Sequence, residues 1–258
     1  MEIQILGAHA AEVKGARLAS LLIDEVLTVD AGGLTPALSL PQQEKIKAVL
    51  LSHHHFDHTR DLVTLGANAG YWQGQIEVYG LRYTLDVIIS CLLDGKMYIN
   101  LLEYPNKEKP SLLLKAIEPY RKEVIAGYDV LPLPVKHSVP TVGYQISSPD
   151  GKSLFYTGDT GPGFVLAIGQ HISPHLLISE VYGPNKFEDW LKSVGHMSAK
   201  LLKEELTQFK ELKGYLPRVI AIHIGNPYEQ QIEEEVAQVA KELGADISLG
   251  HEDMRVTL

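Results

Sequence analysis

Residues 53–58 read His-His-His-Phe-Asp-His, a density of metal-binding side chains that few other functions need. Alternate residues of an extended segment point the same way, so His53 and His55 can share one metal ion. Asp57 and His58, just past the bend, can turn toward a second ion. Imidazole and carboxylate groups suit Zn²⁺, and also Mn²⁺ or Fe²⁺. The segment therefore predicts a metal site in which His54 is a spacer; an incidental His-rich tract is the alternative.

Further polar residues with the same chemistry lie at or near the ends of strand-like runs. They are His137, Asp159, Glu180 and His223, and His196 lies just before an expected helix. Polar groups that follow a buried strand are where α/β folds usually place their chemistry. We therefore expect these residues and the loop 53–58 to converge on one site.

The apolar pattern predicts the strands and helices that position these groups. Val49, Leu50 and Leu51 form a continuous apolar run, typical of a strand covered on both faces, that leads into the loop 53–58. A hairpin turn is predicted at Pro149-Asp150-Gly151, and Ser198 is expected to cap a helix. The expected strands are 3–6, 18–23, 26–30, 46–51, 76–79, 112–117, 123–135, 141–147, 153–157, 176–181, 219–224 and 247–249; the expected helices are 61–69, 81–93, 198–209 and 229–243. No repeat or linker interrupts them, so we expect one domain over residues 1–258.

The His-x-His-x-Asp-His motif, followed in order by His137, Asp159 and His223, resembles the metal-binding signature of the metallo-β-lactamase superfamily over nearly the whole chain. The resemblance implies an α/β fold, a four-layer αββα sandwich with the site at one edge of two sheets. It also implies two divalent metal ions, most simply zinc, sharing a bridging hydroxide. By this resemblance the first ion is bound by His53, His55 and His137, the second by Asp57, His58 and His223, and Asp159 bridges both.

Glu180 and His196 look like the phosphodiesterase branch of that superfamily, which includes ribonuclease Z and class II type cyclic-nucleotide phosphodiesterases. In that branch the His meets the scissile phosphate and the Glu orients it. The poor alkoxide leaving group of a phosphodiester needs a proton or a positive partner, which His196 can supply. Asp57, Glu180 and His196 are therefore the expected catalytic residues of a metal-dependent hydrolase. A structural hydrogen bond at the helix start is the alternative role for His196.

The substrate expected is a small phosphodiester, most simply a 3′,5′-cyclic nucleotide. Asp159 follows His137 by 22 positions, and this interval holds one hairpin and leaves no room for the arm of tRNA-processing ribonuclease Z-like enzymes. A formal net charge of −9 also disfavours broad nucleic-acid binding. Ribonuclease Z-like processing, lactone or thioester hydrolysis, and an inactive scaffold subunit remain the alternatives. The His at position 55, where flavodiiron proteins carry Glu, argues against oxygen or NO reduction.

The remaining expectations concern single residues and the setting of the protein. Cys91, the one cysteine, lies in an apolar run and is expected to be buried. Gly32 and Gly33 are expected to form a tight turn beside the metal loop, and Asp30 to support a metal-binding His. His251 is expected at the surface. No membrane span or signal peptide is predicted, so we expect a cytoplasmic protein, and similar phosphodiesterases suggest a homodimer.

Overall fold

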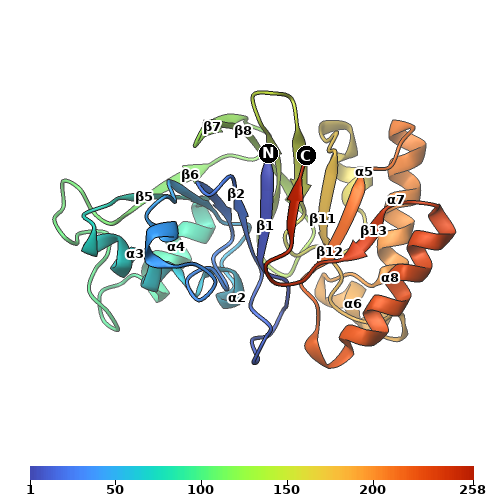
Figure 1. The fold of residues 1–258 in the computed structure, drawn as a ribbon, viewed down its shortest axis with the longest axis horizontal. Helices are drawn as coiled ribbons and strands as arrows, with labels where there is room; N and C mark the ends of the chain where they lie inside the picture. Colours follow the sequence, from blue (N-terminus) through green and yellow to red (C-terminus); the bar gives the residue numbers. More distant parts are fainter.

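Two seven-stranded sheets face each other in the computed structural model, which describes residues 1–258 (Figure 1). One sheet has the order β14-β1-β2-β3-β4-β5-β6, and the other has the order β13-β12-β11-β10-β9-β8-β7. The first sheet contains β1 Glu2–Gly7, β2 Ser20–Ile23, β3 Leu27–Val29, β4 Ala48–Leu50, β5 Ile76–Leu81, β6 Leu112–Ile117 and β14 Arg255–Thr257. The second contains β7 Glu123–Ile125, β8 Tyr128–Val135, β9 Thr141–Ser147, β10 Ser153–Tyr156, β11 Leu176–Glu180, β12 Arg218–Ile222 and β13 Ile247–Leu249.

Helices cover the outer face of each sheet, on opposite sides of the molecule in Figure 1. The first sheet carries α3 and α4, and the second carries α5, α7 and α8. The helices are α1 Leu40–Gln43, α2 Phe56–Thr59, α3 Leu62–Tyr71, α4 Arg82–Cys91, α5 Phe164–Ile168, α6 Glu188–Val194, α7 Ala199–Lys213 and α8 Glu229–Leu243, with short 3₁₀ turns η1 Gly169–His171, η2 Asn185–Phe187 and η3 Asn226–Tyr228. This is the predicted four-layer αββα sandwich. None of these helices is long and apolar enough to cross a lipid bilayer.

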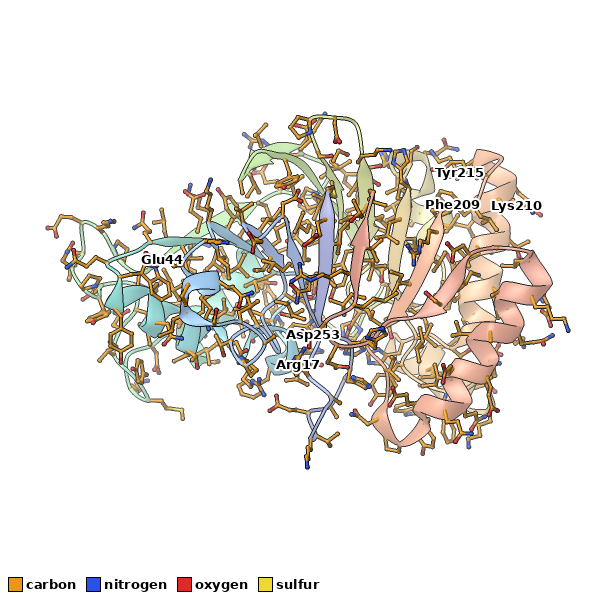
Figure 2. All side chains as sticks on the ribbon, viewed as in Figure 1. Arg17, Glu44, Phe209, Lys210, Tyr215 and Asp253 are labelled. Carbon is orange, nitrogen blue, oxygen red and sulfur yellow. The ribbon has the colours of Figure 1, made fainter.

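The central strands of the first sheet, β2, β3 and β4, are buried on both faces because each face lies against another layer. In β4, Ala48 and Leu50 join the cluster between the two sheets, whereas Val49 joins the cluster beneath α3 and α4. Packing of the outer helices is visible in Figure 2, where Phe209 of α7 lies near Tyr215 with ring centroids 5.5 Å apart. Burial on both faces therefore explains the continuous apolar run before the loop 53–58. That residues 1–258 form one domain stays a prediction, which a single unfolding transition would support.

Three expectations need correction. The segment 123–135 is two antiparallel strands, β7 and β8, because Ala126 and Gly127 adopt positive φ angles of 50° and 90° and form a two-residue turn. Cys91 is exposed, because the chain turns at Leu92 and places Leu93 in the core instead. Gly32 and Gly33 do not have positive φ; a Cβ at Gly32 would lie 1.9 Å from the carbonyl oxygen of Asp57. The chain does bend at Gly32 and Gly33 beside the loop 53–58, but the close approach of two backbones is what requires glycine at position 32.

His9 joins the end of β1 to the C-terminal loop. Its Nδ1 lies 2.8 Å from Glu252, which also accepts hydrogen bonds from the backbone N–H groups of Ala8 and Arg17. Nearby, the guanidinium of Arg17 pairs with Asp253 at 2.8 Å (Figure 2). Burial lowers the pKa of His9, but Glu252 and Glu229 outweigh burial and raise it overall. The pKa of Glu252 falls to about 2, because His9 and the Arg17 N–H outweigh burial.

The pair His9–Glu252 predicts a stability that depends on pH. The raised pKa of His9 stabilises the fold below about pH 6.5, and this stabilisation is lost as pH rises through the folded pKa. The depressed pKa of Glu252 stabilises the fold above about pH 4.5, and this stabilisation is lost as pH falls toward 2. We expect His9→Gln to lower the free energy of unfolding by about 2 kcal/mol near pH 6, and by less near pH 9. Urea unfolding at both values measures this; an equal loss at both would contradict the charged pair.

Candidate metal centre

The candidate ligands come from strand ends that meet at one edge of the two sheets. His53 follows β4, His137 follows β8, Asp159 follows β10 and His223 follows β12. In the second sheet β10, β11 and β12 are parallel, so their carboxyl ends lie side by side. The convergence that the sequence predicted for these residues is therefore present.

The first group consists of His53, His55, His137 and Asp159, whose ligand atoms all lie within 4.8 Å of one another. Nε2 of His53 lies 3.8 Å from Oδ2 of Asp159, and Nε2 of His137 lies 3.7 Å from the same oxygen. Nδ1 of His55 lies 3.3 Å from Nε2 of His137. Four donor atoms at these separations can surround one divalent ion.

The second group consists of Asp57, His58, Asp159 and His223, with the same mutual limit of 4.8 Å. Oδ1 of Asp159 lies 3.2 Å from Nε2 of His58 and 3.4 Å from Nε2 of His223. Oδ2 of Asp57 lies 3.2 Å from Nε2 of His223. Asp159 thus faces the first group with one oxygen and the second group with the other, as a bridging carboxylate must.

The buried polar atoms of these groups fit a pair of cations. Nε2 of His53, Nε2 of His58 and Oδ1 of Asp159 are buried and make no hydrogen bond. A buried polar atom left without a partner costs the fold about 1–3 kcal/mol, so such atoms rarely converge by accident. A metal ion in each group would give every one of them a partner. His54 belongs to neither group, as predicted, and its ring lies edge-on to that of Tyr83.

A hydrogen-bonded layer behind the ligands leaves their Nε2 lone pairs free. Nδ1 of His58 donates to Asp30 at 2.7 Å, and Nδ1 of His137 donates to the carbonyl oxygen of Gly195 at 2.9 Å. Nδ1 of His53 lies 3.0 Å from the hydroxyl of Ser52, which itself donates to Asp30 at 2.8 Å. With the proton held on Nδ1, each ring turns its Nε2 toward Asp159 as a ligand. The predicted supporting role of Asp30 has its geometric basis here.

Asp30 predicts an effect on metal affinity without contact to a metal. Its buried carboxylate accepts hydrogen bonds from Ser52, His58 and Tyr156, the last at 2.6 Å. We expect Asp30→Asn to weaken metal binding about 10–100-fold, because an amide cannot accept all these protons and His58 loses its orientation. Titration with a metal-competing chelator measures the change. Asp24→Asn, a change at an exposed carboxylate away from the site, is the control, and an unchanged affinity in Asp30→Asn would refute the role.

The electrostatics of the cluster favour the deprotonated forms of His53, His137 and Asp159 and the protonated form of His58. Burial lowers the pKa of His137 to about 4, and burial together with His58 lowers that of His53 well below its ordinary value. Burial alone would raise the pKa of Asp159, but His223 and His58 hold it well below the usual range. For His58, Asp159 and Asp30 outweigh burial and raise the pKa well above normal. A cation is thus stabilised at Nε2 of His58, and a metal ion would compete there with a proton.

Two backbone features hold the ligands in place. His223 has a φ of 59°, which is uncommon for a residue with a side chain and carries strain. Backbone hydrogen bonds of the next residue offset this strain: the N–H of Ile224 donates to the carbonyl oxygen of Ala8, and the N–H of Ala10 donates to that of Ile224. Gly195 has a φ of 80°, and a Cβ there would lie 3.0 Å from Cα of His137. Glycine at 195 therefore lets His137 and the loop before α7 lie against each other.

His196 and Glu180 form a pair beside the second group. Nδ1 of His196 lies 3.0 Å from Oε2 of the buried Glu180 at the end of β11. The ring of His196 stacks on Tyr182 with centroids 4.6 Å apart, and it lies 5.7 Å from the ring of His223. Ser198 caps α7 directly after this loop, as predicted. Carboxylate and aromatic face together fix the imidazole next to the candidate ligands, with Nδ1 occupied and Nε2 available.

Some contributors to this site escaped the sequence interpretation. Ser52 and Tyr156 complete the network around Asp30, and Tyr182 supports His196. Ser52 and Tyr182 have a signal in retrospect, because each lies within two residues of a predicted site residue. Tyr156 has none, since a tyrosine at the end of a buried strand looks like any core residue. His251 lies exposed in the C-terminal loop, as expected.

The family model described as a beta-lactamase superfamily domain matches residues 20–224, which is most of the chain and includes every candidate ligand. The chain belongs to the beta-lactamase superfamily. With this membership and its His/Asp cluster, it is a metal-dependent hydrolase. No curated protein matches the sequence.

Solved structures of the superfamily share the fold at low sequence identity. Unliganded yeast PDE1 has a TM-score of 0.82 at 18% identity, covering 100% of this chain and 99% of that chain. The short form of human tRNase Z has a TM-score of 0.71 at 17% identity, covering 100% and 99%. A diphosphatase of the PhnP family has a TM-score of 0.70 at 15% identity, covering 100% and 97%. At these identities the likeness establishes the fold, and the site must supply the argument for the substrate.

Proposed function

We propose that the chain is a dinuclear-metal phosphodiesterase that hydrolyses a small phosphodiester, most simply a 3′,5′-cyclic nucleotide. The observation that carries this proposal is the His196–Glu180 pair, held at 3.0 Å beside the second ligand group. A thioester releases a thiolate, which departs without a proton, whereas the alkoxide that leaves phosphorus needs one. A buried His–carboxylate pair aimed at the metal centre meets that need of a phosphodiester.

The residues proposed to hold the metals are those of the two groups. His53, His55 and His137 would bind one ion, Asp57, His58 and His223 would bind the other, and Asp159 would join them. Two bound divalent cations would supply a hydroxide nucleophile at neutral pH and stabilise the charge that develops on the phosphoryl oxygens. Zinc suits this set of imidazoles and carboxylates best, and metal analysis of the purified protein tests that choice.

Side chains of the protein, rather than the metal ions, are proposed to protonate the leaving group. Glu180 accepts the Nδ1 proton of His196 and fixes the ring, while Tyr182 covers one face of it. The Nε2–H of His196 can then donate a proton to the departing oxygen as its bond to phosphorus breaks. Asp57 faces His223 across the second group and shapes the same edge of the site. His196 is thus the proposed general acid, and Glu180 its positioning residue.

Charge and loop length support a small substrate. The chain carries a formal net charge of −9, which opposes binding of a long polyanion. Between His137 and Asp159 the chain forms only the hairpin of β9 and β10, which offers no arm for RNA. The fold similarity to yeast PDE1 is compatible with this choice, and the similarity to human tRNase Z makes RNA processing the second candidate.

A substrate panel on the metal-loaded protein tests the proposal. Bis(p-nitrophenyl) phosphate, 3′,5′-cyclic AMP, a tRNA precursor and a lactone would be compared by kcat/KM. Preference for cyclic AMP supports the proposal, whereas preference for the tRNA precursor supports RNA processing. Turnover of the lactone alone would overturn phosphodiester hydrolysis while leaving the metal centre intact. Light scattering of the same sample tests the homodimer that we also propose.

The general-acid role predicts a specific dependence on pH. Burial lowers the pKa of His196, but Glu180 outweighs burial and raises it to about 9, so the ring is protonated through neutral pH. Turnover should therefore fall on the alkaline side. In Glu180→Gln the pKa of His196 should return toward about 6.5, moving that fall to lower pH. Profiles of kcat against pH for the parent protein and Glu180→Gln measure this shift. If kcat falls at the same alkaline pH in both proteins, His196 is not the general acid.

A further inference from the structure

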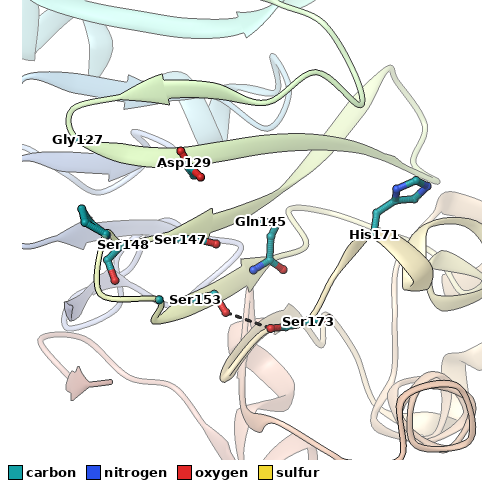
Figure 3. A pocket seen from close by; sticks show the side chains of 10 residues that line it. Gly127, Asp129, Gln145, Ser147, Ser148, Ser153, His171 and Ser173 are labelled. Carbon is teal, nitrogen blue, oxygen red and sulfur yellow. Dashed lines mark hydrogen bonds between the residues drawn. The ribbon is translucent and has the colours of Figure 1, made fainter.

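A polar groove of about 530 Å³ lies at the end of β8, β9 and β10 remote from the metal centre (Figure 3). His137 and Asp159 follow the carboxyl ends of β8 and β10, whereas the groove is lined by residues at the opposite ends of these strands. The eight residues of β8 span about 26 Å, so the two sites share strands but no side chains. The groove is therefore separate from the proposed catalytic site.

The groove exists because short side chains replace large ones on the outer face of the sheet. Asp129, Ser147 and Ser153 lie opposite one another on neighbouring strands and form one rung. In the next rung on the same face, Gln145 lies between Leu131 and Phe155. Alternate residues share a face, so the hollow over the serine rung opens directly beside the Gln145 amide. No hydrophobic side chain lines the groove.

The amide of Gln145 is the feature that points to a ligand. Its side chain is 9% exposed, and its Oε1 is buried without any hydrogen-bond partner. Figure 3 shows Gln145 among the lining residues, between Ser147 and His171. The neighbouring Ser153 is already committed, since its hydroxyl donates to the carbonyl oxygen of Ser173 at 3.1 Å. A buried acceptor without a donor costs the fold free energy. Rotation of this amide by half a turn about its last bond would bring Oε1 to the groove, where a donor from a ligand would offset that cost.

The lining selects one class of ligand by its chemistry. It contains one carboxylate, Asp129, and no lysine or arginine, which disfavours anions. A single carboxylate, already paired with Lys122 at 3.0 Å, is too few for a tightly held hard cation. Apart from Pro149, the side chains that line the groove are polar, which disfavours a purely apolar molecule. Amide, carboxylate and serine hydroxyls instead offer acceptors and donors in alternation, which neighbouring hydroxyl groups can match.

We propose that this groove binds a neutral polyhydroxylated molecule of the size of one or two sugar rings, independently of the metal centre. Its hydroxyls donate to Oε1 of the rotated Gln145 amide and to the Asp129 carboxylate, and accept from the hydroxyls of Ser147 and Ser173. The volume of the groove lies in the range typical of small-molecule sites. The ligand is held by hydrogen bonds alone, so we expect a dissociation constant in the micromolar to millimolar range.

Amide chemical shifts of the ¹⁵N-labelled, metal-loaded full chain test the proposal. Maltose and myo-inositol serve as neutral probes, and inorganic phosphate serves as the anionic one. We expect at least one neutral probe to shift the amides of Ser147, Gly151 and Ser173 to saturation, with phosphate leaving them unchanged. If neither neutral probe moves these amides at tens of millimolar, or if they shift only residues of the loop 53–58, the proposal is wrong.

Variants locate the binding and separate it from catalysis. Gln145→Leu has similar volume but no hydrogen-bonding group, and we expect it to abolish the shifts while keeping a dispersed spectrum. Asp129 is exposed and tolerates change, so Asp129→Asn, expected to weaken binding about tenfold, decides the matter if Gln145→Leu does not fold. Asp189→Asn on α6 is the matched control. His196→Ala should bind the probe as the parent does, so loss of the proposed catalysis leaves this result intact; unchanged binding in both groove variants would overturn the site.

Discussion

Replacing His196 with alanine is expected to lower turnover of cyclic AMP about 10²–10⁴-fold while both metal ions stay bound. His196 lies outside the two ligand groups but 5.7 Å from the ring of His223, so its removal should spare the metals and strip the leaving group of its proton donor. Steady-state kinetics and metal analysis of the same preparation measure the two effects.

Comparing two substrates with different leaving groups makes this experiment more specific for general-acid catalysis. p-Nitrophenolate departs without a proton, whereas the ribose alkoxide of a cyclic nucleotide needs one. We therefore expect a much smaller loss with bis(p-nitrophenyl) phosphate than with cyclic AMP. His251→Ala, at an exposed histidine of the C-terminal loop, is the control and should behave as the parent. An equal loss for both substrates would argue against a general acid, and parallel loss of metal would make His196 a structural residue.

Asp159→Asn is expected to remove both metal ions and to lower turnover by more than about 10³-fold, because no other residue belongs to both ligand groups. An amide offers one neutral oxygen where the carboxylate offers two charged ones. Metal content by elemental analysis, after dialysis against buffer free of metal, measures the loss.

A comparison with Asp57 makes the bridging role testable. Asp57 belongs to the second group alone, so Asp57→Asn should retain about one ion per chain where Asp159→Asn retains none. His54→Ala changes the spacer of the same loop and should retain both ions. If Asp159→Asn and Asp57→Asn lose the same number of ions, Asp159 does not bridge the two groups.

The metal loop was predictable because its information is local. His53 and His55 alternate along an extended segment, and Asp57 and His58 follow at the bend, so spacing alone indicates two directions. Glu180 and His223 were predictable for a related reason, since each terminates or follows a buried parallel strand. The sandwich was implied by the resemblance to the superfamily, and the strands that are apolar on both faces agree with it, because they require a layer on each side.

Contacts between residues that are far apart in the sequence could not be predicted from local spacing. Asp30 and Tyr156 are 126 residues apart and His9 and Glu252 are 243 apart, yet each pair shares a short hydrogen bond. Cys91 was misplaced because its apolar neighbours suggest burial, whereas the turn at Leu92 rotates it outward. Gln145 looked like an ordinary strand residue, and only the register across three strands reveals the hollow beside it. Only the tertiary structure shows these contacts and the burial of these residues, because composition and periodicity do not determine them.

The pairing of β1 with β14 means that the first sheet cannot be completed until late in synthesis on the ribosome. Glu2 lies opposite Thr257, so β1 leaves the ribosome 255 residues before the strand that covers its outer edge (Figure 1). At about 5–20 residues per second, the wait is on the order of 10–50 s. During it, the nascent chain exposes a strand edge whose Ile3 and Ile5 are destined for the core. A chaperone that holds nascent chains should therefore act on this protein until residue 257 has left the exit tunnel.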